Sequence, residues 1–230
     1  MSNMQNSINH HINDDTLLGY ANATLAGTLS LVVATHLSVC PKCRKQLDLV
    51  LSVGSTFLDQ ADNNDLSSKE MSFLDEIVAT PQDAPQAHEE DITAEKLTKA
   101  ITVPGPLNNF IPCELDEIPW KRLVPGVSHY PLQGIKNGDG KGALRLLKID
   151  PGTTLPEHTH SGQELTLILK GSYIDEVGRF AEGDIADLDD SIHHQPVADT
   201  SVECICLIAT DAPLKFKGFF SRLLQPIIGI

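Results

Sequence analysis

The sequence has no apolar run long enough to cross a membrane, and its first residues, MSNMQNSINHH, have neither a basic start nor an apolar core. We therefore expect a soluble, cytoplasmic protein without a signal peptide or a membrane anchor. Basic residues are also few, with 17 Lys and Arg against 31 Asp and Glu and a formal net charge of -14. Because a nucleic-acid-binding protein neutralises phosphates with Lys and Arg, this balance argues against direct contact with nucleic acid and favours a basic protein partner.

Cysteine is scarce, and its count of 5 is odd. Two cysteines form a C-x-x-C, Cys40 and Cys43, which in a reducing compartment indicates metal or redox chemistry before a disulfide framework. Cys204 and Cys206 alternate along a predicted strand, so they share one face, where we expect them to pack in the core. The length of 230 residues leaves room for one large domain or two small ones.

The first part of the chain has a helical pattern, because apolar residues recur at steps of three and four. We predict a helix capped by Asn13 or Asp14, a second over about residues 28–37, and a third that begins near Pro41. The third helix is expected to bury Leu47, Val50, Leu51 and Leu58. A capping box of the S-x-x-E type, Ser67 to Glu70, predicts a fourth helix, which either completes a bundle or packs against a partner.

A candidate zinc motif, H-x3-C-x2-C, lies within this helical part and consists of His36, Cys40 and Cys43. His36 and Cys40 are one turn apart, and Cys43 follows at the head of the next helix, so the three side chains can converge at a helix junction. A tetrahedral structural zinc needs a fourth ligand, and His10 and His11 are the candidates. A thioredoxin-like redox motif would need a preceding strand, and the segment before Cys40 is helical in pattern.

The pattern changes after a linker. Residues 81–97 are acidic and contain two prolines, and from about residue 98 short β segments alternate with Pro- and Gly-containing turns. Many short strands with turns between them indicate a closed sheet. We therefore predict an α + β protein of two domains: residues 1–80 form a small zinc-binding helical bundle, and residues 98–230 form an antiparallel β-barrel.

The second candidate site lies in the predicted β domain, in PGTTLPEHTHSGQELTLILKG. This segment reads G-x5-H-x-H-x3-E-x6-G. Alternate residues of a strand share a face, so His158 and His160 point the same way, and Glu164 returns toward them after a short turn. Imidazole and carboxylate suit zinc, iron, manganese or nickel, so the ligand types limit the metal without naming it.

This segment resembles the first motif of the cupins, which are small antiparallel barrels that hold a metal inside. The resemblance implies a fourth metal ligand on a later strand, for which the sequence offers His193 and His194. His194 fits the second cupin motif better, because Ser191 and Pro196 stand at the expected distances from it. The proline and glycine normally found ahead of this histidine are replaced by Asp189 and Ser191.

The order of the two motifs resembles the ChrR-type anti-sigma factors, in which a zinc-containing anti-sigma domain precedes a cupin. The opening HHINDDTLLGYA matches the family, in which the second of the paired histidines is a ligand, so the resemblance implies zinc ligands at His11, His36, Cys40 and Cys43. It also implies a group IV sigma factor as partner, released in response to singlet oxygen, and a divalent metal in the cupin, expected to be zinc. The alternative is a metal-dependent, dioxygenase-like cupin enzyme with a helical appendage. The sequence leaves the oligomeric state open.

Overall fold

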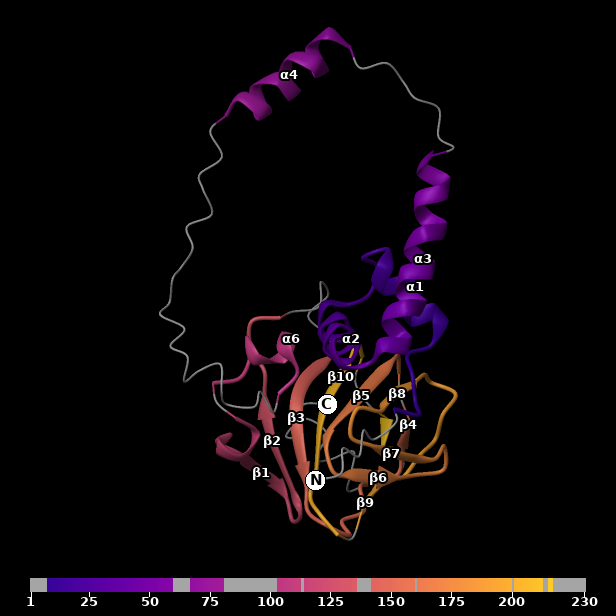
Figure 1. Ribbon diagram of the computed structural model, residues 1–230. Helices are drawn as coiled ribbons and strands as arrows, with labels where there is room; N and C mark the ends of the chain where they lie inside the picture. Colours follow the sequence, from indigo (N-terminus) through magenta and orange to yellow (C-terminus); the bar gives the residue numbers. More distant parts are fainter. Residues whose placement is uncertain are drawn as a thin grey trace, which may run out of the picture. The chain divides into compact units, whose positions relative to one another are not determined.

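The computed structural model describes residues 8–59, 67–80, 103–112, 114–135, 142–159, 161–199, 201–212 and 215–216 (Figure 1). The chain divides into two compact units, one of residues 1–51 with 102–230 and the other of residues 52–101. The first helices thus belong to the same unit as the strands. The predicted domain limits at residues 80 and 98 remain a prediction, and the predicted linker and His160 lie outside the described residues.

The predicted helices are confirmed. They are α1 Asp14–Ala21, α2 Gly27–Val39, α3 Pro41–Asp59 and α4 Ser68–Ala79. Asn13 stands at the N-cap position of α1, but its side chain makes no capping hydrogen bond and donates instead to the carbonyl oxygen of Asp187. Two aspartates in the first turn interact favourably with the positive end of the helix dipole. Pro41 begins α3, where its missing N–H costs no hydrogen bond. No helix in the described part of the chain is both long and apolar enough to span a membrane.

The capping box of α4 is present, with the Ser67 N–H donating to Glu70 Oε2 at 2.7 Å and the Glu70 N–H donating to Ser67 Oγ at 3.3 Å. The predicted buried face of α3 is wrong at Leu51, which is 50% exposed. Leu58 lies in α3, but its side chain is outside the described part.

The strands form three antiparallel sheets. The large sheet has the order β1-β2-β3-β10-β5-β8, a three-stranded sheet the order β7-β6-β9, and β11 pairs with β4. The bounds of these strands are β1 Lys121–Val124, β2 Val127–Pro131, β3 Ala143–Ile149, β4 His158–Thr159, β5 Glu164–Lys170, β6 Ser172–Ile174, β7 Arg179–Ala181, β8 Ile185–Leu188, β9 Val197–Ala198, β10 Cys204–Thr210 and β11 Lys215–Phe216. Two short helices, α6 Gly105–Asn108 and the 3-10 helix η1 Leu115–Glu117, precede them. The described strands form a cupin-like jelly roll with separate sheets, so the expected single closed barrel is corrected to this arrangement.

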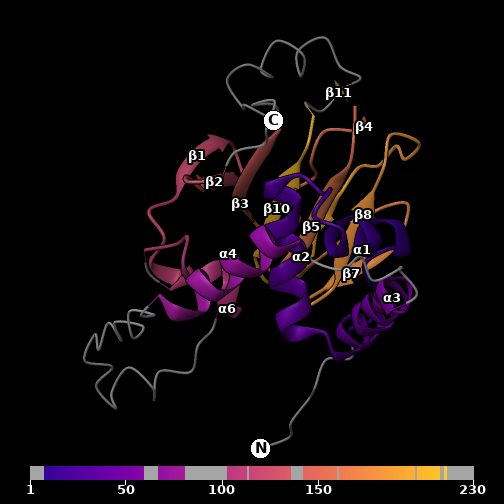
Figure 2. The ribbon, with the colours of Figure 1, turned by 90° about the horizontal axis from the view of Figure 1, so that it is seen from above.

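The central strands of the large sheet, β10 and β5, are buried on both faces. On β10, Cys204, Cys206 and Ile208 pack into the core between the sheets. The alternate residues Ile205 and Leu207 face the other way and join a core that includes Leu29, Val32 and Val33 of α2. Figure 2 shows α2 lying over β10 and β5. The helical segment and the jelly roll therefore share one hydrophobic core.

The last glycine of the first cupin motif is required by the backbone. Gly171 links β5 to β6 with a φ of 73°, a conformation that other residues rarely adopt. A Cβ at this position would also collide with the carbonyl oxygen of Glu203, beside the start of β10. Gly171 thus lets the chain turn from the large sheet into the small one.

Two adjacent leucines of α1 test how much of the stability comes from this shared core. Leu17 is 0% exposed and Leu18 is 48% exposed. We expect Leu17→Ala to lower the free energy of unfolding by about 2–5 kcal/mol, because it leaves a cavity, and Leu18→Ala to lower it by far less. Urea unfolding followed by circular dichroism measures both. Equal effects of the two substitutions would contradict the packing described.

Candidate metal centres

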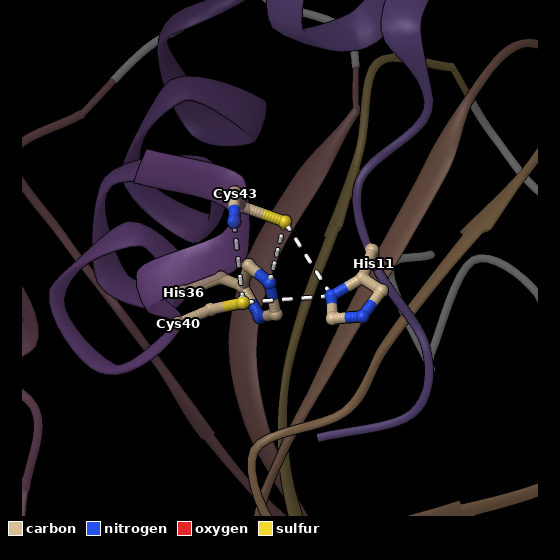
Figure 3. Close-up of side chains that lie close together, drawn as sticks. All are labelled: His11, His36, Cys40 and Cys43. Atoms are coloured by element: carbon tan, nitrogen blue, oxygen red, sulfur yellow. Dashed lines mark hydrogen bonds between the residues drawn. The ribbon is translucent and has the colours of Figure 1, made fainter. Parts of the chain in front are cut away.

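The first cluster joins the N-terminal segment to the junction of α2 and α3. Figure 3 shows His11 approaching from the extended segment before α1, opposite His36, Cys40 and Cys43. One ligand atom from each residue can be chosen so that all four lie within 4.8 Å of one another. His36 and both cysteines are buried, and His11 is half-buried.

The junction between the helices positions three of these side chains. His36 lies in the last turn of α2, which ends at Cys40 in an extended conformation, and Pro41 then begins α3. Cys43 lies in the first turn of α3, and its N–H donates to Cys40 Sγ at 3.4 Å. Backbone N–H groups at a helix start favour a thiolate, so the junction suits cysteine ligands.

The distances fit a tetrahedral metal. His36 Nε2 lies 3.3 Å from Cys43 Sγ, and His11 Nδ1 lies 3.4 Å from Cys40 Sγ and 3.6 Å from Cys43 Sγ. With zinc–sulfur bonds of about 2.3 Å and zinc–nitrogen bonds of about 2.0 Å, tetrahedral ligands stand about 3.5 Å apart. The four side chains could therefore hold zinc without rearrangement of the backbone.

Burial keeps two of the candidate ligands in this cluster neutral. Burial raises the pKa of the Cys43 thiol to about 11. Burial, followed by the neighbouring His11, lowers the pKa of His36 to about 4. The imidazole is thus neutral and ready to ligate at neutral pH, whereas the thiol would lose its proton when a divalent cation binds.

The second cluster lies inside the jelly roll and consists of His158 on β4, Glu164 on β5 and His194. His158 and His194 pair through their backbones, each N–H donating to the other's carbonyl oxygen at 3.2 Å. Their Nε2 atoms lie 2.9 Å apart, and His158 Nε2 lies 4.0 Å from Glu164 Oε2. Because metal–nitrogen bonds are about 2.1 Å long, ligands at right angles stand about 3 Å apart, so the two imidazoles fit neighbouring positions on one metal.

The outer contacts of the two imidazoles set their tautomers. His158 Nδ1 lies 2.9 Å from the carbonyl oxygen of Pro156, which can only accept, so Nδ1 donates. His194 Nδ1 lies 2.8 Å from Asp175 Oδ2, and both side chains are buried. Both Nε2 atoms then carry lone pairs and face each other, an arrangement that a cation between them stabilises.

Asp175 is a functional candidate that the sequence did not indicate. It lies in the turn between β6 and β7, outside both cupin motifs. Its Oδ1 accepts hydrogen bonds from the N–H groups of Val177 and Gly178, at 2.9 and 3.1 Å, which fixes the carboxylate beside His194. The only sequence signal is the turn pattern Asp-x-x-Gly, which by itself predicts a turn and no ligand contact.

The structure also distinguishes between the paired histidines. It brings His11 and His194 into the clusters, whereas His193 is exposed and the ring of His10 packs against Phe180 at a tilt of 35°, with 4.2 Å between ring centroids. The position of His160 lies outside the described residues. The assignment of all eight residues as ligands remains a prediction.

Cys204 and Cys206 lie in the core between the sheets. The hydrogen bond with Cys204, together with burial, raises the pKa of the Cys206 thiol well above its usual value. Cys206 is therefore a neutral thiol at physiological pH, and packing accounts for its position.

Comparisons with known proteins agree with the resemblances seen in the sequence, both for the jelly roll and for the whole chain. Residues 108–213 match the model of the ChrR cupin-like domain family. The chain is 37% identical over 228 residues to the anti-sigma-E factor ChrR of Cereibacter sphaeroides, covering 97% of this chain and 100% of that protein. It also resembles a chain in the crystal structure of Rhodobacter sphaeroides SigE in complex with the anti-sigma ChrR, with a TM-score of 0.70 and 35% identity over 89% of this chain and 100% of that chain.

The contact between Asp175 and His194 can be tested by Asp175→Asn. We expect its amide group to face His194 Nδ1 and favour the tautomer protonated on Nε2, which would weaken metal binding at this cluster about 10–100-fold. The matched control is Glu176→Gln, because Glu176 lies in the same turn and accepts from the Gln195 N–H. Nitrogen-15 NMR of the histidines and metal titration measure the tautomer and the affinity. An unchanged tautomer in Asp175→Asn would refute the role given to Asp175.

Proposed function

Since the chain belongs to the family of ChrR anti-sigma factors, we propose that it sequesters a sigma factor of group IV in the cytoplasm. The observation that carries the proposal is the likeness over nearly the whole chain to a protein whose solved structure is a complex with SigE. This likeness includes the helical part and the jelly roll together, which favours a regulator over a cupin enzyme. The partner is a protein, and no direct contact with nucleic acid is proposed.

The exposed apolar side chains of the unit of residues 52–101 support a protein partner. On α3, Val53 and Phe57 are exposed. The described side chains of α4 are exposed as well, and five of them are large and apolar: Met71, Phe73, Leu74, Ile77 and Val78. An apolar helix face of this kind is suited to burial against another protein. We therefore assign α4 to sigma-factor binding, the second of the two roles that the sequence leaves open for it.

In this proposal the first cluster holds a structural zinc. His11, His36, Cys40 and Cys43 supply four ligands, which leaves no open position for a substrate. Zinc at this point would tie the N-terminal segment to the start of α3 and so fix the direction in which α3 begins.

The jelly roll is proposed as the module that responds to oxidative stress, with singlet oxygen as the signal. His158, Glu164 and His194 would hold a divalent metal, with zinc the proposed ion and His160 the proposed fourth ligand. Imidazole rings are reactive toward singlet oxygen, and addition of oxygen to one ring would make a larger and more polar group inside the buried site. The core shared by α2 and the large sheet supports the idea that such a change can reach the helical segment.

The proposed sigma-binding surface is tested by Phe73→Glu on α4, because Phe73 is 62% exposed. Placing a carboxylate on the apolar face should weaken binding of the cognate sigma factor about tenfold or more, as expected for an aromatic residue central to an interface. The control is Ser72→Glu, which adds the same charge to an exposed position on the neighbouring polar face of the helix. Isothermal titration calorimetry measures both. The surface is wrongly assigned if both variants bind like the parent.

The proposed response is tested by His158→Ala and His194→Ala. Both variants should bind the sigma factor like the parent but release it more slowly under singlet oxygen, because the reactive ligand set is incomplete. His193→Ala is the control, since His193 is adjacent in sequence but exposed. Release from a preformed complex, illuminated with a photosensitiser, gives the rate. Parent-like release in both ligand variants would place the sensor elsewhere.

A further inference from the structure

The segment of residues 8–13, which carries His11, lies against the turn between β7 and β8. The N–H groups of Asn9 and His10 donate to Asp184 Oδ1, at 2.6 and 3.0 Å. The Ile185 N–H donates to the carbonyl oxygen of His10 at 3.4 Å. This backbone contact holds the residue directly before His11 on the jelly roll.

Asp184 is itself held firmly. It is 1% exposed, and its other carboxylate oxygen accepts from the Ala181 N–H at 2.9 Å. Burying a carboxylate is costly unless hydrogen bonds compensate for the lost water. Two of these three donors come from the N-terminal segment, so its docking is part of what keeps the Asp184 carboxylate in this position.

The same turn also contacts the side chain of Ile8, at Gly183. A Cβ on Gly183 would lie 2.9 Å from Cγ1 of Ile8, so only glycine allows this approach. The turn of Gly183 and Asp184 thus lies directly against the segment that carries His11.

We propose that the turn formed by Gly183 and Asp184 is the outer support of the N-terminal metal cluster, and that Asp184 is a positioning residue for His11. The jelly roll then supplies no ligand to this cluster but determines where one of its four ligands stands. A displacement of the turn would move His11 away from the cluster and leave three ligands. A structural change in the jelly roll would in this way alter the zinc site directly. This inference rests on the proposed zinc site and is independent of sigma-factor binding.

The experiment uses the full-length chain loaded with Co²⁺, whose sulfur-to-metal charge-transfer bands report only the cluster that contains cysteine. We expect Asp184→Asn, which replaces one acceptor oxygen by a donor, to alter these bands and to speed zinc transfer to a chromophoric chelator about tenfold. Ile8→Ala removes the side chain that lies against Gly183. It should change the bands and the transfer rate in the same direction, but by a smaller amount.

The matched control is Asp199→Asn. Asp199 also accepts several hydrogen bonds, from Ser172, Ser201 and Arg179, but within the jelly roll. The Asp199→Asn variant should release zinc at the parent rate even if its stability in urea falls as much as that of Asp184→Asn. The proposal is overturned if Asp184→Asn keeps the parent bands and rate, or if Asp199→Asn releases zinc equally fast. If the parent protein shows no such bands, the zinc site itself is refuted. If the parent shows the bands but does not bind the sigma factor, only the proposed function is refuted.

Discussion

A β-sheet with two apolar faces cannot leave either of them in water, and this constraint organises the molecule. One face of the large sheet packs against the small sheet of the jelly roll, and the other packs against α2. Because α2 also carries His36 and ends at Cys40, burial of the sheet fixes the position of the first metal cluster. The helical segment is therefore attached to the jelly roll by a shared hydrophobic core as well as by the connecting chain.

Both clusters illustrate how outer contacts orient candidate metal ligands. His158 and His194 are oriented by a backbone carbonyl and by a carboxylate, so each imidazole presents Nε2 to the interior. The first cluster is organised differently, with its cysteines set by a helix junction and His11 set by a backbone docked on Asp184. Ligand residues alone are thus an incomplete description of either site.

The parts that could be predicted from sequence are those with a local cause. The helix starts follow from Pro41 and the capping box at Ser67, and the spacing of the motif brings His158 and Glu164 into one cluster. The docking of α2 on the sheet has no local cause, although a helix reading GTLSLVVATHLSV, apolar on most sides, is typical of burial from more than one direction. Asp175 and Asp184 are indistinguishable by sequence from 29 other acidic residues, because their roles depend on contacts distant in the chain. Strands of two residues, such as β4 and β9, are too short to produce a periodic pattern.

The position of Cys204 and Cys206 on the central strand limits which molecules can reach their thiols. β10 is hydrogen-bonded on both sides, to β3 and β5, and its two sulfur atoms lie in a core that the small sheet covers. Charged oxidants, glutathione and oxidoreductase proteins are excluded from such an interior unless the fold opens. Small neutral molecules that dissolve in apolar surroundings, as dissolved oxygen does, can diffuse into it. Access to the two thiols thus depends on the size and charge of the reagent.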